Sequence, residues 1–158
     1  MSAAQLVEAL RSRKYSLGLA ESCTGGLLSS VLTAIPGVSD LYKGAIVSYS
    51  NSVKEEILGV NPATLKKFGA VSAECAAEMA KGARRVLKVD CAIAITGIAG
   101  PNGGSMDKPV GTVFLAIQGP DFEYSKKEIF AGSRTEIQSK SVDCSIEYLL
   151  NQILNAHS

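Results

Sequence analysis

Two hydroxyl side chains and a thiol stand directly before two glycines in the segment 19–30, LAESCTGGLLSS. An apolar run precedes them and a helical pattern follows, so Ser22 is expected at a strand end just ahead of a helix. The N-terminus of a helix stabilises an anion, which makes Ser22 a candidate nucleophile. The amides of Thr24, Gly25 and Gly26 are candidates to bind the oxyanion that its attack would create. Alternatively, Thr24 only caps the helix and the glycines only permit a tight turn.

The histidine content restricts the chemistry that such a serine could use. The one histidine is His157, next to the last residue, where a chain end is usually frayed. Ser-His-Asp, Cys-His and histidine-metal sites are therefore nearly excluded. Cys23 is the rival nucleophile, but no histidine is there to activate it, and successive residues at a strand end face opposite ways. We expect Ser22 to face the cleft and Cys23 to be a bystander.

A lysine in the segment 49–56, YSNSVKEE, could supply the missing base. The spacing of Ser52 and Glu55 predicts a capping box, which places Lys54 in the first turn of a helix. The helix dipole opposes a cation there by about 0.3–1 kcal/mol. That field and partial burial would lower the lysine pKa and favour the neutral amine that a general base requires. A serine with a lysine base is an alternative to Ser-His, although an exposed lysine also tolerates this position.

Three further features could bind a ligand. Tyr49 either points into the cleft or is a half-buried strand tyrosine. The segment 96–104, TGIAGPNGG, lacks the P-loop and G-x-G-x-x-G patterns, yet Thr96, Gly97 and Gly100 could let the backbone approach a ligand. Its alternative is a mobile surface loop. Arg134 follows Ser133, the expected cap of the last helix, and is a cation in the first helical turn. It could bind a phosphate bidentately or be an ordinary surface residue.

The elements that would position these residues alternate between strands and helices. Apolar alternation and turn residues predict strands over 15–20, 44–51, 90–96, 112–118 and 123–130. The last two strands should form an antiparallel hairpin. One helix is expected to begin near residue 3 and another to cover 61–69. Four more should begin at the caps Thr24, Ser52, Ser72 and Ser133. This order predicts a three-layer α/β/α domain on a mixed, mostly parallel sheet, with ligands at the carboxyl ends of strands.

Composition limits the broad class of protein. The 158 residues are 46% hydrophobic, which fits a single domain over 1–158. Sixteen basic and fifteen acidic residues give a net charge near zero. The sequence therefore lacks the excess of positive charge that is typical of a nucleic-acid-binding protein. No apolar stretch is long enough to span a membrane and no targeting segment is evident, so a cytoplasmic protein is expected. The four cysteines form no C-x-x-C pair, so neither a metal site nor a thioredoxin-like redox motif is expected.

Six motifs in one order resemble the CinA C-terminal domain family: AESCTGG, YSNSVK, GAVS, TGIAGPNGG, KPVGTV and FAGSR. The resemblance extends from about residue 3 to 154. It implies hydrolysis of the carboxamide of nicotinamide mononucleotide to nicotinate mononucleotide and ammonia. The family's serine, lysine and tyrosine fall on Ser22, Lys54 and Tyr49, and its substrate-binding threonine and arginine fall on Thr96 and Arg134. A homodimer is also implied.

These expectations combine into one mechanism. Lys54 would deprotonate Ser22, the following amides would bind the oxyanion, and the glycine loop and Arg134 would hold the ribose phosphate of a small nucleotide. No cofactor is needed in this scheme. An alternative is a module that binds a nucleotide without turnover, and another is an interaction protein linked to competence or DNA repair.

Overall fold

The computed structural model describes residues 1–156, and His157 lies outside the described residues. Within that range the chain forms five strands, six α-helices and one 3-10 helix. The strands are β1 (Leu17–Glu21), β2 (Tyr42–Val47), β3 (Cys91–Gly97), β4 (Thr112–Gln118) and β5 (Glu123–Ile129). The helices are α1 (Ala3–Arg13), α2 (Leu27–Thr33), η1 (Val38–Asp40), α3 (Asn51–Glu56), α4 (Pro62–Phe68), α5 (Ala73–Leu87) and α6 (Arg134–Asn155).

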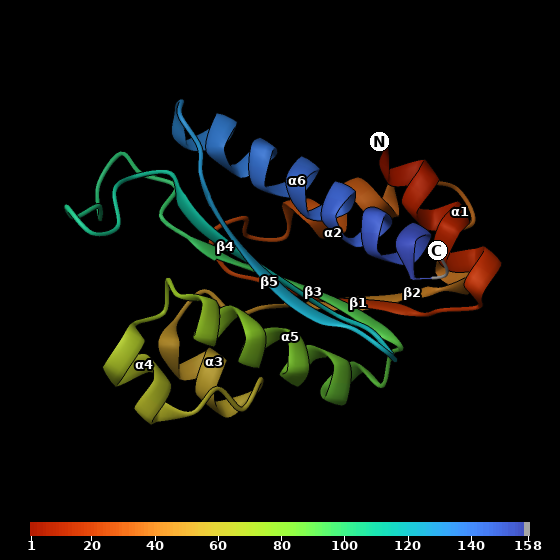
Figure 1. Cartoon of the computed structure of the whole chain (residues 1–158), viewed down its shortest axis with the longest axis horizontal. Coiled ribbons are helices and arrows are strands. Elements are labelled where there is room, and N and C mark those ends of the chain that lie inside the picture. The colour runs from red at the N-terminus through yellow and green to blue at the C-terminus, as the bar shows by residue number, and fades with distance from the viewer. Residues whose placement is uncertain (157–158) are drawn as a thin grey trace.

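The strands form one mixed sheet in the order β2-β1-β3-β4-β5 (Figure 1). β1 pairs in parallel with both β2 and β3, whereas β4 is antiparallel to β3 and β5. The predicted hairpin of the last two strands is confirmed. Because β1, β2 and β3 run the same way, the segments that follow them emerge at one edge of the sheet.

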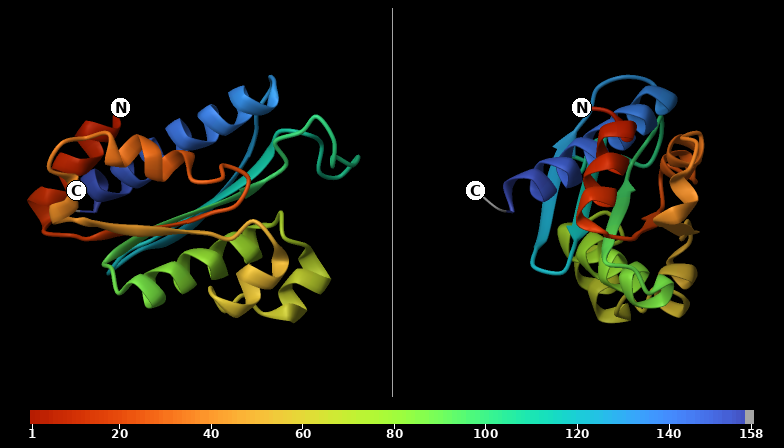
Figure 2. Two further views of the ribbon diagram at one scale, coloured as in Figure 1. Left: turned by 180° about the vertical axis from the view of Figure 1, so that it is seen from behind. Right: turned by 90° about the vertical axis from the view of Figure 1, so that its right-hand side faces the viewer.

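Helices cover both faces of the sheet. α1, α2 and α6 lie on one face, and α3, α4 and α5 lie on the other (Figures 1 and 2). The predicted three-layer α/β/α architecture is therefore confirmed. No helix in residues 1–156 is both long and apolar enough to cross a membrane.

The central strand β3 shows why the two helical layers differ. Its side chains alternate, so that Ile93 and Ile95 join the core under α1, α2 and α6, and Ala92 and Ala94 face α5. The facing surface of α5 also carries small residues, which let this helix approach the sheet closely, as its alanine content predicts. The expected apolar stripe of α5 ends early, because Val86 is exposed.

Polar caps fix where several helices begin. Asn61, Ser72 and Ser133 each accept a backbone N–H at the start of α4, α5 and α6. The caps at Ser72 and Ser133 were predicted from sequence, whereas the cap at Asn61 was not. Each cap satisfies one of the amides that a helix N-terminus leaves without an intrahelical partner. The Ser133 cap fixes the start of α6 and hence the place of Arg134, its first residue.

The packing of α5 also supports the segment that carries Lys54. Gly82 of α5 lies against the backbone of Leu58, which follows α3. The segment after Leu58 turns back toward α3, where the Val60 N–H donates to the Lys54 carbonyl at 3.0 Å. A Cβ at Gly82 would overlap the Leu58 carbonyl oxygen. The close contact of these two segments therefore requires glycine at this position.

We expect Gly82→Ala to lower the free energy of unfolding by about 1–3 kcal/mol, because the added methyl group must displace the Leu58 backbone. In an exposed helix the same change stabilises by about 1 kcal/mol. Urea unfolding measures the difference, with Lys81→Ala at the adjacent exposed position as the control, expected within about 0.5 kcal/mol of the wild type. A stabilised Gly82→Ala variant would contradict this packing.

Candidate active site

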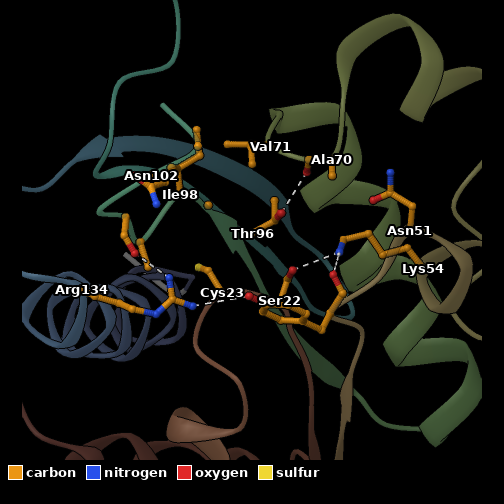
Figure 3. Close-up of a pocket in the computed structure, with 15 residues that line it drawn as sticks. Ser22, Cys23, Asn51, Lys54, Ala70, Val71, Thr96, Ile98, Asn102 and Arg134 are labelled. Carbon is orange, nitrogen blue, oxygen red and sulfur yellow. Dashed lines mark hydrogen bonds between the residues drawn. The ribbon is translucent and has the colours of Figure 1, made fainter. Parts of the chain in front are cut away.

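A pocket of about 330 Å³ opens at the sheet edge where β1, β2 and β3 end (Figure 3). Its walls come from the turn after β1, the start of α3, the loop before α5, the glycine loop after β3 and the start of α6. The lining residues are Ser22, Cys23, Tyr49, Asn51, Lys54, Ala70, Val71, Thr96, Gly97, Ile98, Ala99, Gly100, Asn102, Gly103 and Arg134. The polar corners that sequence analysis placed at strand ends thus meet at one site.

Ser22 and Lys54 contact each other at one end of this pocket (Figure 3). The Lys54 Nζ lies 3.0 Å from the Ser22 Oγ. Both side chains are buried, and Lys54 is only 1% exposed. No acidic side chain forms an ion pair with Lys54 in residues 1–156. The pair therefore has the separation that direct proton transfer requires.

Two carbonyl groups hold the Lys54 amine on its other sides. Nζ donates to the Ser48 carbonyl at 2.6 Å and to the Tyr49 carbonyl at 3.2 Å. Carbonyl oxygens only accept hydrogen bonds, so these contacts use two of the nitrogen's protons and leave its third direction toward Ser22. In the neutral amine that direction is the lone pair, which can accept the serine proton.

Burial lowers the pKa of Lys54 below the ordinary lysine value, because loss of water disfavours the charged form. The nearby Cys75 and Cys23 side chains oppose this change to a smaller extent. The predicted direction of the pKa shift agrees, and burial, one of its two predicted causes, is the largest cause.

The predicted capping box of α3 is wrong. The cap is Ser50, whose side chain accepts from the Val53 N–H, and not Ser52. The helix therefore begins two residues earlier, and Lys54 is its fourth residue. Six residues give only a weak dipole, so the position of Lys54 is explained by its burial between strand ends.

The predicted role of Thr24 as the cap of α2 is also wrong. The cap position is Gly26, which has no side chain to accept a hydrogen bond. The Thr24 hydroxyl instead donates to Glu21 Oε1 at 2.7 Å, and the Leu28 and Ser29 amides donate to the same carboxylate. A buried carboxylate on the preceding strand thus replaces the local cap, which residue spacing alone did not reveal.

The turn after β1 does not bring Thr24, Gly25 or Gly26 into the pocket lining. The Gly25 N–H already donates to the Ser22 carbonyl at 3.1 Å, so it is not free to bind an oxyanion. Gly25 and Gly26 have φ of 58° and 103°, in the left-handed region that favours glycine. These glycines shape the turn, as the simpler interpretation of the sequence held.

Cys23 lines the pocket beside Ser22. Burial raises the pKa of its thiol to about 11, so the thiolate is scarce at neutral pH. A thiol in this state is a poor nucleophile. Its backbone nevertheless belongs to the turn that borders the pocket.

Arg134 lies at the end of the pocket opposite Lys54 (Figure 3). Its guanidinium donates to the Gly100 carbonyl at 2.6 Å and to the Tyr49 hydroxyl at 3.4 Å. No ion pair in the described part of the chain includes Arg134. A guanidinium carries five donors, and these contacts use two, so Arg134 retains donors for an anion. Tyr49 is 65% exposed and borders the pocket between these ends.

Thr96 and Gly97 form the floor of the pocket rather than a mobile loop. The Thr96 hydroxyl donates to the Ala70 carbonyl at 2.9 Å (Figure 3), which fixes the loop before α5. Gly97 lies so close to the Thr112 carbonyl and Val113 that any side chain would clash. Gly100 has φ of 78° and turns its carbonyl to Arg134.

Several pocket residues were not singled out from sequence. Asn51 and Asn102 contribute amide side chains, and Ala70 and Val71 contribute an apolar wall. Asn51 stands inside the YSNSVK motif and Asn102 inside TGIAGPNGG, so both motifs contained the signal. Residues 1–156 contain no group of three or more His, Cys, Asp or Glu side chains placed to hold a metal ion.

Comparisons with known proteins agree on one family. The sequence model described as the CinA C-terminal domain matches residues 1–153. A CinA-like protein from Fervidobacterium nodosum is 46% identical over 147 residues, which are 93% of this chain and 36% of that protein. The chain thus spans about a third of the length of the curated relatives it matches.

Solved structures share the whole fold. A competence-damaged protein (CinA) superfamily member from Klebsiella pneumoniae superposes with a TM-score of 0.93 at 33% identity, covering 99% of this chain and 96% of that one. A competence/damage-inducible protein from Agrobacterium tumefaciens gives a TM-score of 0.91 at 40% identity, covering 95% and 93%.

The buried amine makes stability depend on pH in a defined direction. Because the pKa of Lys54 is lower in the folded chain than in the unfolded chain, the unfolded state binds the proton more readily. We expect the wild type to lose stability relative to Lys54→Met as the pH falls through the unfolded value of about 10.4 to the folded pKa. Below that value the difference should stay constant.

Urea unfolding of both proteins at pH 7 and at pH 10.5 or above measures this difference. Lys88→Met, at an exposed lysine that follows α5, is the matched control and should show no such dependence. A constant difference between the wild type and Lys54→Met across this pH range would contradict the inferred burial of the amine.

Proposed function

Given that the chain belongs to the CinA C-terminal domain family, we propose that it is an amidohydrolase that converts nicotinamide mononucleotide to nicotinate mononucleotide and ammonia. Such an activity would return nicotinamide mononucleotide to NAD synthesis. The observation that carries the proposal is the buried contact of the Ser22 Oγ with the Lys54 Nζ at 3.0 Å. The proposed substrate rests on the family resemblance, and the proposed nucleophile and base rest on the contacts in the pocket.

The first step is attack by Ser22 on the carboxamide carbon of the substrate. Lys54, as the neutral amine, accepts the Ser22 proton while Oγ forms the new C–O bond. The Ser48 and Tyr49 carbonyls keep the amine oriented during this transfer. Positioning of this kind removes much of the entropic barrier to a reaction between two groups.

The negative charge that develops on the carboxamide oxygen needs a donor near Ser22. The Ser22 N–H donates to the Ile95 carbonyl at 3.0 Å and is therefore occupied. We assign the donor role to the N–H of Cys23, the next residue, which also lines the pocket. Loss of one oxyanion donor costs about 2.7–4 kcal/mol in comparable enzymes.

Collapse of the tetrahedral intermediate completes the acyl transfer. The Lys54 ammonium returns its proton to the substrate nitrogen, the C–N bond breaks, and ammonia leaves. Ser22 then carries a nicotinoyl ester. A water molecule, deprotonated by the again neutral Lys54, attacks this ester, and Ser22 recovers its proton as the carboxylate product departs.

The other end of the pocket suits the phosphate of the substrate. Arg134 retains guanidinium donors beyond those that contact Gly100 and Tyr49, and arginine binds phosphate bidentately. Asn51 lies on the Lys54 side of the pocket and Asn102 on the Arg134 side (Figure 3), and their amides can bind ribose hydroxyls. In the proposed binding mode the carboxamide lies at Ser22 and the phosphate at Arg134.

We expect the wild type to release ammonia steadily from nicotinamide mononucleotide, and Ser22→Ala and Lys54→Ala to lower kcat by about 10³-fold or more, because each removes one half of the nucleophile and base pair. A coupled glutamate dehydrogenase assay measures the ammonia. Ser12→Ala, at an exposed serine of α1 whose hydroxyl donates to the Glu8 carbonyl of the same helix, is the matched control and should keep wild-type activity.

Two outcomes would contradict the proposal. Binding of the nucleotide without ammonia release would favour the module that binds without turnover. Full activity of Lys54→Ala would remove the lysine from the mechanism, even if the hydrolysis itself were observed.

We expect Arg134→Ala to raise KM for nicotinamide mononucleotide by about 10-fold or more, because charge-assisted contacts to the phosphate are worth about 1.5–3 kcal/mol. Nicotinamide riboside, which lacks the phosphate, is the matched substrate. Its kcat/KM should be low and nearly equal in the wild type and the variant. Equal losses for both substrates would show that Arg134 acts on the pocket and not on the phosphate.

A further inference from the structure

The end of β1 contains a buried carboxylate to which the proposed reaction assigns no step. Glu21 is the last residue of β1 and is fully buried, at 0% exposure. No ion pair within residues 1–156 includes Glu21. A buried carboxylate without a cation is costly unless hydrogen bonds compensate it. Three hydrogen bonds to the Glu21 carboxylate compensate its burial.

The Glu21 carboxylate holds the turn that follows Ser22. Oε1 accepts from the Thr24 hydroxyl at 2.7 Å and from the Leu28 N–H at 2.9 Å, and Oε2 accepts from the Ser29 N–H at 3.0 Å. These bonds draw the chain after Ser22 back over the end of β1. Ser22 therefore lies between Glu21 and the turn to α2, which the Glu21 carboxylate holds in place.

No side chain within the turn could replace this carboxylate. The cap position of α2 is Gly26, with φ of 103°, a conformation that residues with a Cβ rarely adopt. An ordinary serine or aspartate cap needs an extended backbone at that position. The turn that presents Ser22 to the pocket therefore requires an acceptor from outside, and Glu21 supplies it.

The backbone of Glu21 connects the same residue to the lysine. Its carbonyl accepts from the Ser48 N–H at 2.8 Å and from the Ser48 hydroxyl at 3.4 Å. The Ser48 carbonyl in turn accepts from Lys54 Nζ at 2.6 Å. Glu21 thus fixes the turn on one side of Ser22 and the strand end that holds Lys54 on the other.

We propose that Glu21 is a positioning residue that sets the distance between the Ser22 Oγ and the Lys54 Nζ and orients the Cys23 amide. The inference rests on the proposed amidohydrolase function. Glu21 does not line the pocket. Its carboxylate acts through the turn, and its backbone carbonyl, which Glu21→Gln retains, provides the contact with Ser48.

The test is Glu21→Gln, which keeps the volume but replaces one carboxylate oxygen by an amide NH₂. In either orientation a donor then faces a donor, because all three partners of the carboxylate donate. We expect kcat for nicotinamide mononucleotide to fall about 100-fold, as displacement of a reacting group by about 1 Å can cause. KM should change less than about threefold, since Arg134 and the glycine loop are untouched.

A second measurement does not depend on the natural substrate. A fluorophosphonate forms a phosphonate ester with an activated serine as fluoride leaves, and intact-mass spectrometry follows the labelling of Ser22. The labelling rate of Glu21→Gln should fall by a factor similar to that for kcat.

Asp90→Asn is the matched control for stability. The Asp90 carboxylate accepts from the Ser16 N–H and hydroxyl, both at 2.8 Å, where the chain enters β1 at the end of the sheet far from the pocket. This variant also removes a charged acceptor that fixes β1, so it should lower Tm while kcat and the labelling rate stay at wild-type values.

The outcomes separate this inference from the proposed function. Wild-type kcat and labelling in Glu21→Gln would overturn the positioning role and leave the amidohydrolase proposal intact. An equal loss of labelling in Asp90→Asn would also overturn it, because general destabilisation would explain the effect. If the wild type is labelled but releases no ammonia, the proposed substrate fails and the labelling rates still decide the role of Glu21. A wild type that is neither labelled nor active overturns both.

Discussion

The burial of one lysine amine against a serine hydroxyl is the interaction on which the site depends. Lys54 has no carboxylate partner within residues 1–156 and is held only by Ser22 and two backbone carbonyls. An amine in such surroundings loses hydration and gains no opposing charge, so its pKa falls. A lysine that served stability alone would be better exposed or paired with an acid. This cost fits the proposed role of Lys54, in which the amine accepts the Ser22 proton and later returns it.

The parallel half of the sheet creates the conditions for this interaction. β1 lies between β2 and β3, and because all three run the same way, the chain leaves them at one edge. Ser22 follows β1, Lys54 follows β2 and Thr96 is the second-last residue of β3, so each strand contributes one part of the pocket. Small residues on α5 and on the facing strands let this helix pack closely on the sheet. The pocket is thus a consequence of strand direction and close packing.

The turn after β1 shows how local structure and the site are coupled. Two glycines in the left-handed region let the chain reverse, but they also remove the side chain that would cap α2. The Glu21 carboxylate, on the strand, accepts hydrogen bonds from the start of α2 in place of that cap. Ser22 therefore lies between the buried Glu21 and the turn that this carboxylate holds. The geometry of the nucleophile therefore depends on a residue that does not line the pocket.

Much of this could be predicted from sequence because the signals are local. Alternation and helical spacing identified the layers, the hairpin and two of the helix caps, Ser72 and Ser133. The single histidine, which lies outside the pocket motifs, directed attention to serine and lysine. The errors also have a local origin. Ser50 and Ser52 are both acceptable caps by type, and Thr24 is a good cap by spacing, so short-range patterns could not choose among them.

The sequence by itself determined the residue types available for catalysis and the order in which the strands deliver them. Only the tertiary structure decided which hydroxyl Lys54 meets, how deeply the amine is buried and where the cap of α2 comes from. Each of these depends on contacts between segments far apart in the chain, such as Ser22 with Lys54 or Arg134 with Gly100. Burial and distance are properties of the packed molecule, and they set the pKa and the reach of the groups that the sequence supplies.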